Sequence, residues 1–200
     1  VMTTKANLVI EQGETFETVV RWETPPLKYK PISAMTKTAP IGITATGHAI
    51  PNGWRVAVVD VVGMTELNAE SAPPTDEEFR AATVIDANTI EFNEVSAALF
   101  KAYKSGGYLA YYTPQDLTGY TARMTVRDRV GGTELVALTS TDSEIILDTA
   151  AFTITLTLAA AVTAAFTWTK GVYDLELVSS TGRVTRILSG TITLSKEVTS

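Results

Sequence analysis

The stretch TAAFTITLTLAAAVTAAFTWTK, residues 149–170, decides the fold class of this chain. It has no charged side chain before Lys170, and it is long enough to cross a bilayer as a helix. From Phe152 to Leu158, however, large apolar residues alternate strictly with threonines, and the side chains of a strand point alternately to opposite faces. The pattern therefore predicts a half-buried strand over 152–158, then one or two helical turns from Ala159 that end before Gly171. We expect no membrane span.

The composition excludes several classes of site and partner. The 200 residues carry a net charge of −6, no cysteine and a single histidine, His48. Thiol chemistry is therefore absent, and a histidine-based metal site or a Ser-His-Asp triad is hard to build. Lys and Arg are scattered along an acidic chain, which disfavours nucleic acid as a partner. The beginning of the sequence has only Leu8, Val9 and Ile10 as consecutive apolar residues, so we expect no signal peptide.

Strand patterns occur in three blocks. In the first, an apolar strand ends at Ile10 and an alternating strand covers 16–22, which predicts a hairpin with its turn at 11–14. A proline-rich connection follows it. The third block predicts three further antiparallel pairs, within 120–140, 144–158 and 172–195.

Seven or so antiparallel strands of this kind normally form two packed sheets. We therefore expect an all-β chain with an immunoglobulin-like antiparallel β-sandwich made from residues 1–33 and 113–200. Exposed loops tolerate insertions, so an inserted domain explains the interruption between the two parts.

The second block, residues 38–112, corresponds to the inserted domain, and its pattern predicts a small β-barrel. Many short strands at close spacing favour a barrel or a compact sheet. The segment 95–107, VSAALFKAYKSGG, resembles a short amphipathic helix closed by glycine. Thr75 and Glu78 have the spacing of a capping box. The expected strands are 41–44, 54–61, 82–86, 89–93 and 108–112.

Both blocks resemble modules of tailed-bacteriophage structural proteins. The runs DLTGYTARMTVRDRVGG at 116–132 and GVYDLELVSSTGRVTRILSGTITLSKEVT at 171–199 are similar to the N-terminal domain of baseplate upper proteins, and VIEQGETFETVVRW at 9–22 resembles its opening strands. GHAIPNGWRVAVVDVVGMTELNA at 47–69, with ATVIDANTIEFN and YKSGGY, resembles the small β-barrel repeat of phage tail and fibre proteins that is named after the FCCH domain of the ubiquitin-activating enzyme. The run AESAPPTDEEFRAA departs from the repeat, because it is longer than the usual link between its strands.

One group of residues is expected to determine the barrel fold. Glycine allows a positive φ, Met64 and Leu67 can lie under the barrel, and Asn68 can bond its own backbone. In the resembled repeat a histidine is common at the position of His48, where it determines the fold. The full set is His48, Gly53, Gly63, Met64, Leu67 and Asn68.

Other side chains suggest binding or catalysis. Tyr108, Tyr111, Tyr112 and Trp54 are candidates for an interaction surface, although alternation along 108–112 places at least one tyrosine in the core. The acidic residues Asp142, Glu144 and Asp148, together with those of TDEEFR at 75–80, have the residue type used in glycoside hydrolysis. They are more simply interpreted as solvated charges, and we expect no catalytic residue, metal or cofactor.

The resemblance implies a non-catalytic structural component of a phage virion. Its expected role is a tail or baseplate adaptor that anchors tail fibres or other tail parts, located in the virion tail after assembly in the host cytoplasm. Its expected partners are other virion proteins, with homo-oligomers in the particle, and not nucleic acid. Two alternatives stay open: a capsid decoration protein, and a carbohydrate-binding module that contacts the host surface.

Overall fold

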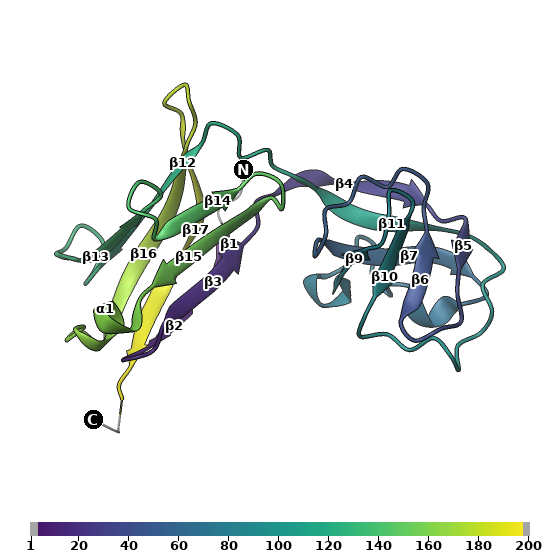
Figure 1. Ribbon diagram of the computed structural model, residues 1–200, viewed down its shortest axis with the longest axis horizontal. Coiled ribbons are helices and arrows are strands. Elements are labelled where there is room, and N and C mark those ends of the chain that lie inside the picture. The colour runs from purple at the N-terminus through teal and green to yellow at the C-terminus, as the bar shows by residue number, and fades with distance from the viewer. Residues whose placement is uncertain (1–3, 198–200) are drawn as a thin grey trace. The chain divides into compact units, whose positions relative to one another are not determined.

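The computed structural model describes residues 4–197, and strands dominate this part of the chain (Figure 1). The all-β class expected from the alternation is confirmed. The chain divides into two compact units: Val1–Trp22 with Gln115–Ser200, which we call the sandwich unit, and Glu23–Pro114, which we call the barrel unit. The expected ends of the sandwich, residues 1–3 and 198–200, lie outside the described residues.

The sandwich unit consists of two sheets. The larger has the order β13-β12-β16-β17, with β1 and β2 both beside β17, and the smaller has the order β14-β15-β3 (Figure 1). The strands of the larger sheet are β1 Thr4–Lys5, β2 Leu8–Glu11, β12 Thr121–Arg127, β13 Glu134–Thr139, β16 Lys170–Val178 and β17 Val184–Ser195. The strands of the smaller sheet are β3 Phe16–Val20, β14 Ile145–Asp148 and β15 Thr153–Leu158.

Strand β15 has the two faces that the alternation predicts. Ile154, Leu156 and Leu158 are buried in a core to which both sheets contribute, and the threonines between them are half-buried. Phe152 lies outside the strand, in a turn, with a positive φ of 56°. The short helix α1, Ala160–Ala164, follows at the expected place. This stretch thus forms a strand and a single helical turn, and no helix within residues 4–197 is long and apolar enough to cross a membrane.

The first two strands of the sandwich unit do not form the expected hairpin. β2 pairs with β17, in parallel, whereas β3 pairs with β15 in the other sheet. Ile10 and Phe16 are both buried in the same core, each from its own sheet. The turn at 11–14 therefore crosses between the sheets. The other three pairs, β12–β13, β14–β15 and β16–β17, are antiparallel as expected.

The barrel unit contains two four-stranded antiparallel sheets, β4-β11-β7-β8 and β5-β6-β10-β9. Their strands are β4 Glu23–Pro31, β5 Ala34–Met35, β6 Ile41–Thr44, β7 Arg55–Val62, β8 Arg80–Ala81, β9 Thr83–Val84, β10 Thr89–Phe92 and β11 Ser105–Pro114. Short 3-10 helices, η1 Thr65–Leu67 and η2 Asp76–Glu78, lie in the connection from β7 to β8.

Two strands run through both sheets and close them into a barrel. β4 continues into β5 past Ile32 and Ser33, whose backbone N–H groups donate to Gly107 in one sheet and Thr44 in the other. β8 continues into β9 through Ala82, which exchanges backbone bonds with Trp54 and Gly53. Because β4 and β5 form one continuous strand, and β8 and β9 another, the eight named strands act as six strands in a closed ladder.

The expected boundaries of the two units are wrong. The boundaries lie at Trp22 and Pro114 and not at 33 and 113, because the proline-rich segment taken as a connection is strand β4, paired with β11. Its exposed prolines fit an edge position, where no N–H is needed. The expected barrel start at residue 38 is also wrong, because the barrel strands β4 and β5 both precede it.

The segment 95–107 contains no helix. The N–H of Ala97 donates to Thr38 and that of Lys101 to the carboxylate of Glu66, so tertiary partners replace the helical ones.

Candidate interaction surfaces

The turn after β7 has the structural role that the sequence predicts. Gly63 has φ +99°, and a Cβ there would clash with the carbonyl oxygen of Ala102, so the position accepts only glycine. Met64 and Leu67 are buried. Asn68 does not bond its own backbone: its Oδ1 accepts from the Val61 N–H at 2.8 Å, and its Nδ2 donates to the Val61 carbonyl at 3.0 Å. The side-chain amide thus occupies the place of a neighbouring strand.

His48 is a buried structural residue. Its Nδ1 accepts the Ile50 N–H at 3.0 Å, which leaves Nε2 to donate to the Asp86 carbonyl at 3.0 Å. Tyr111 donates its hydroxyl to the His48 carbonyl at 2.7 Å, and burial raises the pKa of Tyr111. Gly53, with φ +73°, donates to Ala82 at the point where β8 becomes β9. These residues hold the loops of the barrel unit, and His48 and Tyr111 are buried.

The four aromatic candidates do not share one surface. Trp54 is completely buried and Tyr111 is 5 % exposed, so both belong to the barrel core and the prediction of a surface role for them is wrong. Trp54 Nε1 donates to the Tyr112 carbonyl at 2.9 Å. Tyr112 stacks on Phe79 with ring centroids 5.9 Å apart. Only Tyr108, 40 % exposed, is available to a partner, and it lies edge-on to the exposed Tyr29 at 6.3 Å.

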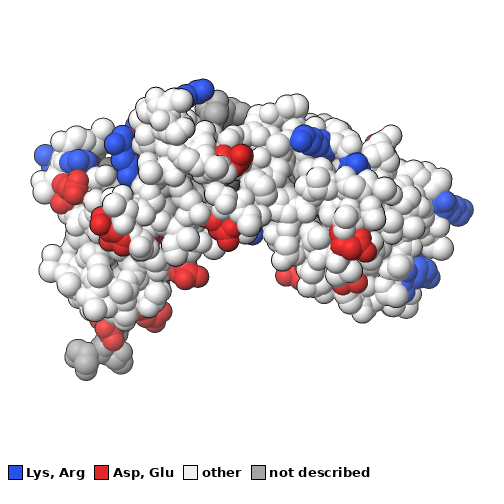
Figure 2. Space-filling view, turned by 45° about the horizontal axis from the view of Figure 1, so that its top comes forward, with Lys and Arg blue, Asp and Glu red and all other residues white. Residues whose placement is uncertain are grey.

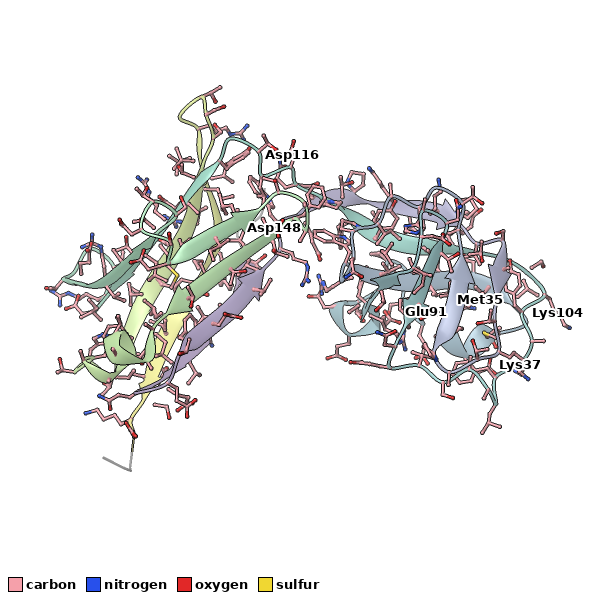
Figure 3. The ribbon with its side chains drawn as sticks, in the orientation of Figure 1. Met35, Lys37, Glu91, Lys104, Asp116 and Asp148 are labelled. Carbon is pink, nitrogen blue, oxygen red and sulfur yellow. The ribbon has the colours of Figure 1, made fainter. Side chains whose placement is uncertain are left out.

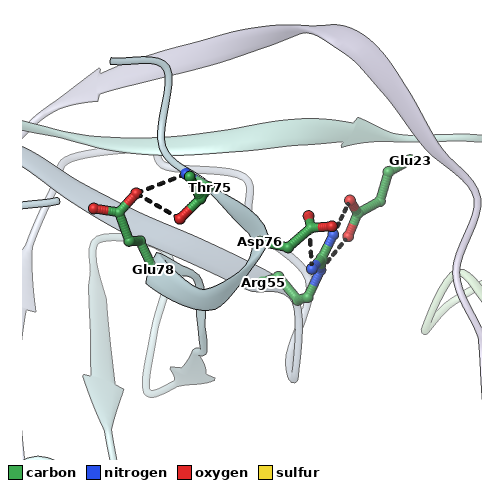
Figure 4. A network of polar contacts seen from close by, with 5 residues as sticks. All are labelled: Glu23, Arg55, Thr75, Asp76 and Glu78. Carbon is green, nitrogen blue, oxygen red and sulfur yellow. Dashed lines mark hydrogen bonds and ion pairs between the residues drawn. The ribbon is translucent and has the colours of Figure 1, made fainter. Parts of the chain in front are cut away.

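The long link from β7 to β8 covers the outer face of the barrel. Ala57, Val59 and Ala110 form a small buried cluster on β7 and β11, and Ala69 and Phe79 from the link pack on it. Arg55 lies over the Phe79 ring at 5.4 Å and forms a paired contact with Glu23, at 2.9 and 2.7 Å, with Asp76 at 3.4 Å (Figure 4). The link that departs from the resembled repeat thus adds a second layer to the unit.

The capping box predicted at Thr75 and Glu78 is present in this link. The Thr75 N–H and hydroxyl donate to Glu78 Oε2 at 2.6 and 2.9 Å (Figure 4), and the Glu70 and Ser71 N–H groups donate to Oε1. These donors, the Thr75 N–H first, lower the pKa of Glu78 to about 2. The carboxylate organises a loop and is poorly suited to act as a general acid.

The acidic residues of the sandwich unit are also engaged locally. Asp148 accepts the Ala150 and Ala151 N–H groups at 2.8 Å in the turn before β15 (Figure 3). Asp142 accepts from the Thr139 hydroxyl at 2.9 Å, and Glu144 accepts the Thr139 N–H at 3.2 Å. Within residues 4–197 no group of three or more His, Asp or Glu side chains is arranged to hold a metal ion.

The outer face of the larger sandwich sheet has a shallow hollow of about 450 Å³. Its lining includes Thr125 of β12, Val172 of β16 and Val130 of the β12–β13 turn. Charges around it are paired across strands: Arg123 with Glu176 at 2.8 Å, Arg127 with Glu134 at 3.4 Å and Arg186 with Asp174 at 3.2 Å. The face is therefore polar and internally compensated.

A second surface lies between the edges of the two sandwich sheets. Among residues 4–197, β2 pairs only with β17 and β3 pairs only with β15, so within this part of the chain each strand has one free edge. A groove of about 310 Å³ lies between these edges, and its lining residues are Asn7, Leu8, Val9 and Glu11 in and before β2, and Glu14, Thr15, Phe16, Glu17 and Thr18 in and before β3. Sequence reasoning missed it because alternation shows that a strand exists but not which strand is its neighbour.

No model of a known protein family matches the chain, and no curated protein is significantly similar to it. The interpretation of these surfaces therefore rests on the residues themselves.

Proposed function

We propose that the protein is a non-catalytic structural component of a phage virion, a tail or baseplate adaptor that binds its neighbours through the sandwich unit. The observation that carries this proposal is the pair of free strand edges, β2 and β3, on one side of the sandwich. Exposed edges are prone to pair with other chains, and proteins use them for strand addition. The sequence resemblance to baseplate upper proteins and to the phage-tail barrel repeat supplies the biological setting.

Assembly with virion parts tests the proposal. The purified protein is mixed with tail components or particles of the phage that encodes it, and sedimentation follows the mixture. A shift of the protein into a larger species, and its recovery with particles, is the expected result. A protein that stays at its own size and never co-purifies with particles contradicts the proposal.

The location in the particle separates the tail adaptor from a capsid decoration protein. Labelled protein on particles, viewed by cryo-electron microscopy, follows the symmetry of the tail in the first case and icosahedral positions in the second.

The exposed pair Tyr29 and Tyr108 favours a second candidate function, binding of a host carbohydrate by the barrel unit. Aromatic faces of this kind are also common in protein interfaces. Loss of glycan binding in a folded Tyr108→Ala variant would support this function. Trp54→Ala is unsuitable for the test, because Trp54 is in the core.

A further inference from the structure

The free edge of β3 has open backbone groups at two positions. Thr157 donates its N–H to Glu144, so Thr157 and Thr155 of β15 are directed toward β14. In an antiparallel ladder, directly opposed residues either exchange both backbone bonds or none. Glu17 and Val19, the residues opposite Thr157 and Thr155, therefore direct their N–H and C=O groups away from β15.

The free edge of β2 is open in the same way. Gln12 donates its backbone N–H to Ser195 of β17, and successive residues of a strand direct their backbone groups to opposite sides. Val9 and Glu11 therefore direct their N–H groups away from β17. Among residues 4–197 no second strand pairs with β2 or with β3, and the side chains of Val9 and Val19 are 54 % and 47 % exposed.

Helix α1 fixes the turn that joins the two edges. The Thr163 hydroxyl, completely buried, donates to the Glu14 carbonyl at 2.7 Å. The Gln12 side chain donates to the Phe166 carbonyl at 2.9 Å. The spacing of the two edges is thus set before a partner arrives, which lowers the conformational cost of binding.

The groove between the edges is acidic. Glu11, Glu14 and Glu17 line it, and none of them takes part in an ion pair among residues 4–197. In the view of Figure 2, acidic side chains lie along the lower part of the sandwich unit, whereas the basic side chains visible there lie toward its upper left. Two copies joined through this edge would bring both sets of three glutamates together, so charge disfavours self-association here.

We propose that the free edge of β3 accepts an extended, cationic segment of another protein, which adds a strand to the smaller sandwich sheet. The backbone of Glu17 and Val19 supplies the ladder bonds. Side chains of the added strand on the core face lie beside Phe16 and Thr18 and are apolar, and alternate ones face outward, with lysine or arginine near Glu17. This inference deepens the proposed assembly function and rests on it for the natural partner, although the edge itself can be tested alone.

A synthetic peptide in which valine and lysine alternate, about six residues long, is the probe. Added to ¹⁵N-labelled protein, it is expected to slow hydrogen exchange at the Glu17 and Val19 amides and to leave the Thr18 amide, already bonded to β15, unchanged. A peptide with glutamate in place of lysine is the charge control. Equal binding of both peptides, or no binding of the lysine peptide, overturns the proposal.

Backbone and charge are separated by substitution. Val19→Pro removes an outward N–H, which an edge strand tolerates, and is expected to abolish binding, whereas Val19→Ala keeps the N–H and retains it. Glu17→Lys is expected to weaken binding roughly fivefold and Glu17→Gln less. If Val19→Pro fails to fold, the two Glu17 substitutions and the pattern of slowed amide exchange still test the proposal. Unchanged binding in folded Val19→Pro, or self-association of the protein through this edge, overturns the proposal.

The outcomes also separate this inference from the virion function. If the peptide binds as described but the protein never joins virion parts, the edge site stands and the virion function fails. If the protein joins virion parts and Val19→Pro does so equally well, the function stands and the strand-addition site is wrong.

Discussion

At the scale of single residues, Asn68 holds the barrel strand β7 with both ends of its amide. Asn68→Asp keeps the acceptor for the Val61 N–H but replaces the donor to the Val61 carbonyl with a charged oxygen. We expect the barrel unit to lose about 1–3 kcal/mol of unfolding free energy, the usual cost of an unsatisfied, partly buried group. Denaturant unfolding measures it. Asn93→Asp, at an exposed position, is the control, and an equal loss there contradicts the assigned role.

Glu78 makes the barrel unit sensitive to acid. Its pKa is about 2 in the folded chain against an ordinary value of 4.5, chiefly because the Thr75 N–H donates to it. A carboxyl group whose pKa is lowered on folding contributes stability above its unfolded pKa, and this is lost as the pH falls through the folded value. The contribution is therefore complete above about pH 5 and disappears between there and pH 2.

Thermal unfolding at a series of pH values checks this. Glu78→Gln is expected to lower the Tm at pH 7 and to flatten its fall between pH 5 and pH 2. Glu77→Gln, a neighbouring exposed position, is the comparison. A Glu78→Gln profile parallel to that of the unsubstituted protein would show that the capping box does not cause the acid sensitivity.

At the scale of elements, β15 tests the alternation that decides the fold class. Leu156 is completely buried between the sheets, whereas Thr155 lies on the other face of the strand. Leu156→Ala is expected to cost 2–5 kcal/mol of unfolding free energy in the sandwich unit, and Thr155→Ala at most about 1 kcal/mol. Calorimetry or denaturant titration compares the two. Similar costs would mean that the two faces are not distinct.

Elements with a strong local pattern were predictable, and their neighbours were not. The period-two pattern identifies β15, β12 and β16, because burial on one face leaves its mark on every second residue. The partners of β2 and β3 are decided by which side of the shared core each apolar face covers, and no local signal carries that choice. The segment 95–107 has helix formers, yet its N–H groups bond to Thr38 and Glu66, and tertiary partners override propensity.

The candidate surfaces followed the same division. The barrel turn was predictable because glycine, asparagine and buried apolar residues have fixed local uses, and Gly63 and Met64 fill them. The prediction of an aromatic surface was wrong for Trp54 and Tyr111, which are buried in the core. A tyrosine or tryptophan is equally suited to a core and to an interface, so residue type alone does not separate the two. The free edges depend on which strand lies beside which, and only the assembled sheets show them.

At the scale of the whole molecule, the connections explain how one fold interrupts another. The Gln115 N–H donates to the Trp22 carbonyl at 3.0 Å in the sandwich unit, and Glu23 is opposite Pro114 in the barrel ladder. The chain therefore leaves and re-enters each unit at neighbouring backbone positions. Replacing Glu23–Pro114 by a short Gly/Ser link is expected to leave a sandwich unit that unfolds cooperatively, and loss of its folded spectrum would contradict this independence.

The same connections couple the stabilities of the two units. The barrel unit is the long loop inserted into the sandwich unit. While the barrel unit is folded, this loop is already closed, so folding of the sandwich unit loses no entropy for closing it. Trp54→Ala removes a completely buried side chain and is expected to unfold the barrel unit first. The sandwich unit must then close a long flexible loop, at a cost of about 3 kcal/mol relative to a short link.

The unfolding midpoint of the sandwich unit in Trp54→Ala should therefore lie below that of the short-linked variant, measured by the fluorescence of Trp22 and Trp168. Equal midpoints would mean that the insertion adds no coupling through the chain.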